Sequence, residues 1–302
     1  MRGVFVDANE TLAAIMERLE QPDPKVRINR DADTTPDQLP AVLDGAEIAM
    51  IDHTALPTEI ARTCAGLKHV VFLGTGARSY MNPEELAELG ISVHLIKGYG
   101  DTAVAEAAIA LMWSSARVIA RMDREMRAGN WLREDGLQLT GKTLGLVGFG
   151  GIAAEVARIA SGSGMKVIAW NRSPKQYPGV TFVDLDTVLA NSHVVSIHLL
   201  LNDDTRGLIG RDRIAAMRPG VILINTARGA IVDEAAMIEA LTSGHIRHAG
   251  LDVFNTEPLP NDHPLTRLPN VTLSAHSAFR TPEASENLIH AALEHCRRIA
   301  KE

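Results

Sequence analysis

The sequence has very few cysteines. Only two occur in 302 residues, Cys64 and Cys296, and they lie far apart in the chain. They form neither a CxxC pair nor the spacing of a metal site. We therefore expect reduced thiols, no disulfide framework and no bound metal, as is usual in a cytoplasmic protein.

The sequence also lacks long apolar runs and an excess of basic residues. The formal net charge of −7 argues against a general nucleic-acid binder and against a protein that binds anionic membranes. The most apolar helical pattern, residues 103–120, is interrupted by Glu106 and Arg117, which favours a core or interface helix over a membrane span. At the N-terminus, "MRGVFVDAN" has only a short apolar run before Asp7, so no cleavable signal is predicted.

Short β-rich runs alternate with helical patterns along the whole chain. Nearly all-apolar strands in such an alternation predict parallel sheets covered on both faces. Too many strands are predicted for one sheet of ordinary size, so we expect two doubly wound α/β domains with a switch at "KGYGDT", residues 97–102. The expected strands are residues 3–8, 26–29, 47–52, 69–74 and 91–96, then 143–149, 166–171, 180–184, 193–199, 221–226, 250–254 and 271–276.

A dinucleotide-binding fingerprint, "GFGGIA", opens the second domain. Gly148, Gly150 and Ala153 form the pattern G-x-G-x-x-A between a predicted strand and a predicted helix. The backbone amides of the first helical turn, at Gly151 and Ile152, are expected to bind the cofactor phosphates. A glycine-rich turn that binds nothing is the alternative interpretation.

The next strand ends in "NRS", where a fingerprint specific for NAD commonly has an acidic residue. The amide of Asn171 does not repel a 2′-phosphate, and Arg172 and Ser173 are able to bind one. We therefore expect NADP to be preferred, with NAD as the other possible cofactor. The alternative is that Arg172 is only a solvated loop charge.

Three polar side chains follow predicted strands of the second domain. Arg228 follows "VILINT", Glu257 follows "GLDVF" and His276 ends "VTLSAH". Because ligands of parallel α/β sheets bind beyond the carboxyl ends of the strands, these residues are candidate catalytic groups. Each residue alone also has a structural interpretation. Arg228 could be a turn residue, Glu257 a solvated acid and His276 a histidine at a strand end.

The order and spacing of four motifs resemble the D-isomer-specific 2-hydroxyacid dehydrogenases. They are "GFGGIA", "INTARGAIVDE", "GLDVFNTEPLPNDHPL" and "LSAHSAFRTPEA", and the resemblance extends over nearly the whole chain. It implies a Rossmann domain, residues 99–281, inserted into a flavodoxin-like substrate domain, residues 1–98 and 282–302, with the active site in the cleft. It also implies that the protein is a homodimer. The small molecule that it binds would be a 2-keto or 2-hydroxy acid.

The resemblance also implies roles for single residues. Arg228 would hold the substrate carboxylate, His276 would donate a proton to the keto oxygen, and Glu257 would orient His276. On the substrate side, the amides of Thr75 and Gly76 would bind the carboxylate and Phe279 would wall the pocket. Thr226 and Asp252 are expected beside the cofactor, although a structural role is equally open for Asp252.

The chain departs from the family pattern at two positions. Arg78 stands where relatives often carry aspartate, and either a second anionic group of the substrate or solvent could face it. Leu200 stands where the family commonly has proline. The expected activity is that of a glyoxylate or hydroxypyruvate reductase of the short form, without a regulatory domain. A nicotinamide-sensing binding module of the corepressor type and a short phosphoglycerate dehydrogenase are the alternatives.

Overall fold

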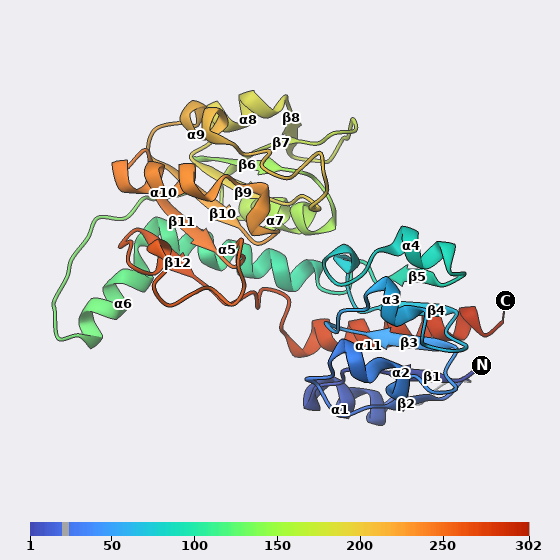
Figure 1. Cartoon of the computed structure of the whole chain (residues 1–302). Coiled ribbons are helices and arrows are strands. Elements are labelled where there is room, and N and C mark those ends of the chain that lie inside the picture. The colour runs from blue at the N-terminus through green and yellow to red at the C-terminus, as the bar shows by residue number, and fades with distance from the viewer. Residues whose placement is uncertain (20–23, 302) are drawn as a thin grey trace. The chain divides into compact units, whose positions relative to one another are not determined.

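A computed structural model of the chain describes residues 1–19 and 24–301. The chain divides into two compact units, one formed by Met1–Gly100 with Arg280–Glu302 and the other by Asp101–Phe279. The last helix, α11 (Pro282–Ile299), thus belongs to the same unit as the N-terminal residues (Figure 1). The sequence placed the unit boundaries after residues 98 and 281.

The first unit is built on a five-stranded sheet in the order β2-β1-β3-β4-β5. All its neighbouring strands are parallel, and the order is that of flavodoxin-like folds. The strands are β1 (Gly3–Phe5), β2 (Val26–Ile28), β3 (Ile48–Ile51), β4 (His69–Phe72) and β5 (Ser92–Leu95).

Helices cover both faces of this sheet because successive strand residues point to opposite sides. Phe5 packs into one cluster with apolar residues of α1 (Glu10–Arg18) and α11, whereas its neighbour Val4 packs into another with Leu39 and Leu86. The second cluster is covered by the short helices α2 (Leu39–Val42), α3 (Thr58–Ala61) and α4 (Pro83–Glu88).

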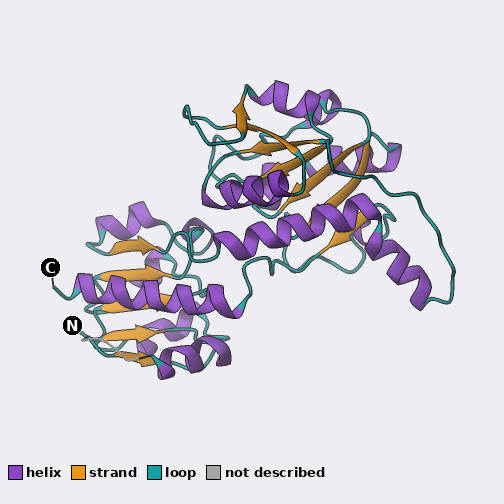
Figure 2. Ribbon diagram, turned by 180° about the vertical axis from the view of Figure 1, so that it is seen from behind, coloured by secondary structure: helices purple, strands orange, loops and turns teal. Residues whose placement is uncertain are grey.

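The second unit is built on a seven-stranded parallel sheet in the order β12-β11-β10-β9-β6-β7-β8. The order reverses at β6, the strand that precedes the fingerprint, as in Rossmann folds. Its strands are β6 (Thr143–Val147), β7 (Lys166–Trp170), β8 (Val180–Phe182), β9 (Val194–Ile197), β10 (Val221–Asn225), β11 (Ile246–Leu251) and β12 (Val271–Leu273). Its helices are α5 (Asp101–Arg117), α6 (Ile119–Arg127), α7 (Gly151–Gly162), α8 (Leu185–Asn191), α9 (Arg211–Ala216) and α10 (Glu234–Ser243) (Figure 2).

The fold class predicted from the sequence is confirmed, but strand β11 is not where it was expected. The prediction was residues 250–254, and the strand is Ile246–Leu251. Its beginning contains two polar residues, Arg247 and His248, so it does not read as an apolar run. It ends before Asp252, whose side chain accepts hydrogen bonds from the amides of Ser277 and Ala278.

The apolar pattern at residues 103–120 forms two helices and not one. Val118 has a φ of 55°, in the left-handed region, and separates α5 from α6. In the described part of the chain no single helix is long and apolar enough to cross a membrane, and α5 and α6 meet that test only when joined across their bend of 67°. Helix α5 is a core helix, since Ala105, Leu111 and Met112 pack into the core that also contains α7 residues.

Strand β11 carries a buried imidazole with a lowered pKa. His248 is 2% exposed, and its Nε2 lies 2.9 Å from Thr272 Oγ1 on β12. Burial lowers the pKa of His248 to about 4, with further lowering by the charges of Arg247, Arg124 and Arg121. The folded protein therefore keeps this ring neutral at pH values where the unfolded chain would protonate it.

We expect the free energy of unfolding to fall as the pH drops from about 6.5 to about 4, because in that window the unfolded state binds the proton that the folded state refuses. The shift corresponds to at most about 3 kcal/mol. His248→Gln removes the titration, so its loss of stability across this window should be smaller than that of the unaltered protein. Urea unfolding at several pH values measures both slopes, and equal slopes would contradict the assignment.

Candidate active site

The turn of the fingerprint is shaped by two glycines with different requirements. Gly148 has a φ of 89°, and a Cβ there would lie 2.4 Å from the carbonyl oxygen of His198. The fold itself therefore requires glycine at this position. Gly150, by contrast, would direct a Cβ into open space, with nothing within 4 Å. The protein leaves the space over Gly150 unfilled, which fits a phosphate that approaches the backbone.

Helix α7 begins directly after this turn. Gly150 is its N-cap residue and, as a glycine, has no side chain to cap the helix. The amides of the first turn, at Gly151 and Ile152, have no partner within the helix and carry the positive end of its dipole. Ala153 is fully buried and packs into the core, as the small third residue of the fingerprint should. The turn and the helix together form a seat for an anion.

Asn171 joins the end of β7 to the fingerprint turn. Its Oδ1 accepts a hydrogen bond of 3.1 Å from the amide of Phe149, and its Nδ2 donates to the carbonyl of Ser173 at 2.8 Å. Both ends of the amide thus bind the protein's own backbone. Asn171 therefore supports the fingerprint turn. The sequence analysis expected it to contact the cofactor.

A hollow of about 380 Å³ opens beside Asn171, Arg172 and Ser173. Lys175 lines it too, and its Nζ donates a 2.6 Å hydrogen bond to the carbonyl oxygen of Phe149. The sequence analysis missed Lys175, although its place two residues after "NRS" was visible. The Nη1 of Arg172 lies 3.4 Å from Oδ2 of Asp204, and both side chains are highly exposed.

Asp184 is the acidic residue on the wall of the same hollow. Its carboxylate caps α8 by accepting from the amide of Thr187 at 2.8 Å and from the Thr187 hydroxyl at 2.6 Å. These bonds hold the pKa of Asp184 below its usual value. With this charge committed to the helix, Lys175 and Arg172 make the hollow suitable for an anion.

Strand β10 delivers Thr226 and Arg228 to the carboxyl edge of the sheet. The hydroxyl of Thr226 is buried and has no hydrogen-bond partner among the described residues. Arg228 donates from Nη1 to the carbonyl of Ala227 at 2.6 Å, which leaves most of its donors available. At Gly229 a Cβ would lie 2.2 Å from the carbonyl carbon of Phe254, so glycine there lets this turn pack on the chain that leads to Glu257.

Glu257 and His276 form a hydrogen-bonded pair. The Oε2 of Glu257 lies 2.6 Å from the Nδ1 of His276, and its Oε1 accepts from the amide of Phe254 at 2.8 Å. Each side chain is about one-third exposed, at 33% and 36%. The amide of Phe254 thus holds the carboxylate of Glu257 in place, and the carboxylate orients the ring of His276. The Nε2 of His276 is left to bind a ligand.

The backbone of His276 is held in an unusual conformation by Asp252. His276 has a φ of 47°, which is rare for a residue other than glycine. Its amide donates to the carbonyl of Asp252 at 2.8 Å, while the buried carboxylate of Asp252 accepts from Ser277 and Ala278 at 3.0 Å each. The sequence analysis left a structural role open for Asp252, and these contacts show one.

The remaining predicted residues lie as follows. Phe279 is half-buried in the turn after His276, at the end of the second unit. Thr75 and Gly76 follow β4 in the first unit, where Gly76 precedes a 3-10 turn at Ala77–Ser79. Arg78 on that turn is exposed and forms an ion pair with Glu84. Leu200, where proline was expected, is 66% exposed.

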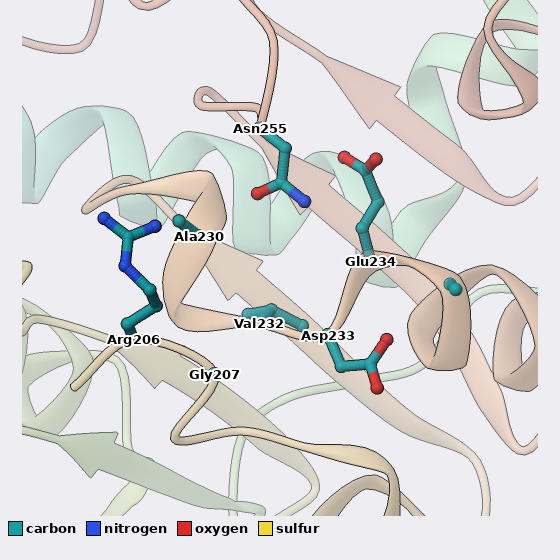
Figure 3. A pocket seen from close by; sticks show the side chains of 8 residues that line it. Arg206, Gly207, Ala230, Val232, Asp233, Glu234 and Asn255 are labelled. Atoms are coloured by element: carbon teal, nitrogen blue, oxygen red, sulfur yellow. The ribbon is translucent and has the colours of Figure 1, made fainter. Parts of the chain in front are cut away.

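A larger hollow, of about 520 Å³, lies next to the turn after Arg228 but contains none of the predicted residues (Figure 3). Arg206 and Asn255 stand on its rim, with Asp233 and Glu234 on the helix α10 side. Asp233 caps α10 through the amide of Ala236, and Glu234 lies 3.2 Å from His263. The acidic groups of this hollow are therefore already bound to other parts of the protein.

Residues 109–278 match the family model of the D-isomer specific 2-hydroxyacid dehydrogenase, NAD binding domain. The match includes the fingerprint, Arg228, Glu257 and His276. The chain belongs to the D-2-hydroxyacid dehydrogenase family.

Relatives and solved structures of this dehydrogenase family agree with the assignment. Hydroxypyruvate reductase of Thermotoga maritima is 38% identical over 83% of this chain and 84% of the relative. D-3-phosphoglycerate dehydrogenase of Archaeoglobus fulgidus is 37% identical over 80% of this chain, which spans only 47% of that relative. The crystal structure of a glyoxylate reductase from Paecilomyes thermophila, 29% identical, covers 100% of this chain and 96% of its own, with a TM-score of 0.88.

The dehydrogenase binds a nicotinamide dinucleotide, and its residues fit one. The open space over Gly150, the uncapped first turn of α7 and the orphaned hydroxyl of Thr226 are features that a ligand would complete. They lie at or next to the carboxyl ends of β6 and β10.

We expect Gly150→Ala and Gly148→Ala to separate folding from cofactor binding. Alanine at position 150 meets open space, so the melting temperature of the ligand-free protein should change little while NADH and NADPH binding is lost. Alanine at position 148 should lower the melting temperature strongly, because it combines a left-handed backbone with a collision against His198. Thermal unfolding and nicotinamide fluorescence measure the two effects, and intact cofactor binding by Gly150→Ala would disprove the assigned seat.

Proposed function

We propose that the protein reduces a small 2-keto acid to the corresponding D-2-hydroxy acid, with glyoxylate and hydroxypyruvate as the first candidates. The observation that carries the proposal is the 2.6 Å contact between Glu257 and His276. A nicotinamide cofactor bound at the fingerprint would supply the hydride for the keto carbon. The protein has to bind the acid, orient it and deliver one proton to its oxygen.

The proton would come from the Nε2 of His276. In the doubly protonated ring, Nδ1 donates to Glu257 and the second proton, on Nε2, is directed away from the carboxylate and toward a substrate. Transfer of that second proton would leave the neutral ring bound to Glu257. The left-handed backbone of His276, held by Asp252, fixes the direction of that donor. A bound acid could thus be protonated without reorientation of the ring.

The guanidinium of Arg228 would bind the carboxylate of the substrate and polarise its keto oxygen. One of its donors is spent on Ala227, and a planar cation with several free donors suits a 2-keto acid, whose carboxylate and carbonyl are adjacent. The backbone amides of Thr75 and Gly76 are proposed as further carboxylate donors, and Phe279 as an apolar wall.

The test is oxidation of NADPH and NADH with a panel of 2-keto acids. At least one acid should be turned over, and Arg228→Ala should lower kcat/KM by about a hundredfold or more, because it removes charge-assisted bonds to the substrate. Arg206→Ala, an exposed arginine of the neighbouring hollow, is the matched control and should retain activity. Tight cofactor binding without turnover of any acid would favour a nicotinamide-sensing module of the corepressor type.

We further propose that NADPH is preferred over NADH. The hollow beside Asn171 contains the cations Arg172 and Lys175 and the hydroxyl of Ser173, and the carboxylate of Asp184 on its wall is committed to α8. A 2′-phosphate would gain charge-assisted hydrogen bonds there, each contributing about 1.5–3 kcal/mol.

Unaltered protein should show a kcat/KM for NADPH about ten- to a hundredfold above that for NADH. Arg172→Ala with Lys175→Met should remove the preference by raising KM for NADPH. Lys166→Met, at the opposite end of the same strand β7, is the control and should keep it. An NADH preference of the unaltered protein would refute the assignment of this hollow.

A homodimer and a cytoplasmic location complete the proposal. Helix α6 and the segment after it expose Ile119, Met126 and Trp131 at 52%, 55% and 76%, an apolar set suited to a second copy of the chain. The free, buried cysteines Cys64 and Cys296 are typical of a reducing compartment.

A further inference from the structure

A carboxylate lies against the first residue of α7. A Cβ placed on Gly151 would come within 1.8 Å of Oδ2 of Asp101 and 2.8 Å of its carboxyl carbon. Asp101 is the first residue of α5, which runs alongside α7 within the second unit (Figures 1 and 2). The side chain of Asp101 therefore fills the place that any other residue at position 151 would need.

In the described part of the chain, no cation and no hydrogen-bond donor contributes to the electrostatics of the carboxylate of Asp101. Partial burial raises its pKa, and the negative charge of Glu155, one turn further along α7, raises it again. The favourable partner nearby is the amino end of α7, whose unbonded amides attract an anion.

We propose that Asp101 sets the affinity of the fingerprint for its cofactor by holding a competing negative charge at the amino end of α7. The inference rests on the proposed function only in requiring a dinucleotide at this fingerprint. The pyrophosphate has to be bound by the same first-turn amides, so it must either displace the carboxylate or lie beside it. Either event weakens binding, and both favour release of the cofactor after turnover.

A purely structural role would look different. An acidic residue in the first turn of α5 also stabilises that helix through its dipole, and it would do so whatever lies at α7. In that case removal of the charge would change the melting temperature and leave the affinity for the cofactor unaltered. Binding to the ligand-free protein therefore separates the two roles, without any need for catalysis.

The first experiment measures dissociation constants by nicotinamide fluorescence and calorimetry. Asp101→Asn should bind NADPH about five- to fiftyfold more tightly than the unaltered protein, the range expected when a like charge a few ångströms away is removed. Adenosine 2′-monophosphate, which has no pyrophosphate, should bind both proteins equally. Asp212→Asn, which neutralises an exposed acid in the first turn of α9, is the matched control and should leave both constants unchanged.

The second experiment tests the contact itself. Gly151→Ala should lower the melting temperature of the ligand-free protein by several degrees, because its Cβ collides with the carboxylate. In an Asp101→Ala background the same substitution should be neutral or raise the melting temperature, since alanine is the better helix former once the space is free. Equal effects of Gly151→Ala in both backgrounds would show that the two residues do not compete, and would overturn the inference.

The outcomes distinguish this inference from the proposed function. If NADPH binds the unaltered protein and Asp101→Asn binds it no more tightly, Asp101 does not set the affinity and the reductase assignment stands. If Asp101→Asn increases the affinity for adenosine 2′-monophosphate as much as that for NADPH, the effect is a general one of net charge and the inference is wrong. If neither NADPH nor NADH binds either protein, both proposals fail.

Discussion

The buried carboxylate of Asp252 is the group on which the arrangement of the candidate site depends. It receives two backbone amides from the turn after β12, and its own carbonyl receives the amide of His276. A buried charge is costly unless it is fully hydrogen-bonded, so this turn has little freedom to adopt another conformation. The left-handed backbone of His276 persists because these bonds define it, and the ring is thereby presented to Glu257.

A second set of contacts connects the fingerprint to the end of β7. The amide of Phe149 binds the side chain of Asn171, and its carbonyl binds Lys175. The ring of Phe149 also packs edge-on to Phe182, at a centroid distance of 5.0 Å. The fingerprint turn and the hollow beside Asn171 are therefore parts of one hydrogen-bonded unit. A change at either end would alter the other.

Glycine serves three separate purposes within four residues of this turn. At position 148 it permits a positive φ and a close carbonyl, at 150 it keeps space open, and at 151 it makes room for the carboxylate of Asp101. The first and the third are demands of the folded chain itself, because a Cβ would collide with His198 or with Asp101. Only the second concerns a ligand, which explains why a glycine pattern alone is a weak sign of function.

The sequence by itself determined the class of fold, the two-sheet organisation and the motifs at the strand ends. These depend on local properties: apolar runs for buried parallel strands, glycine where a turn needs it, and polar residues where a strand stops. The family was also within its reach, because the order of "GFGGIA", "INTARGAIVDE" and "LSAHSAFRTPEA" is far more specific than any one of them.

Only the tertiary structure decided which of these residues meet. Glu257 and His276 belong to the connections after different strands, and Asp101 and Gly151 lie at the ends of different helices, so their contacts arise from packing between distant segments. Strand β11 began earlier than its apolar residues indicated, and the long apolar helix broke at Val118, because packing overrides local preference. Lys175 gained its importance in the same way, from a carbonyl at Phe149 that no pattern near "NRSPK" reveals.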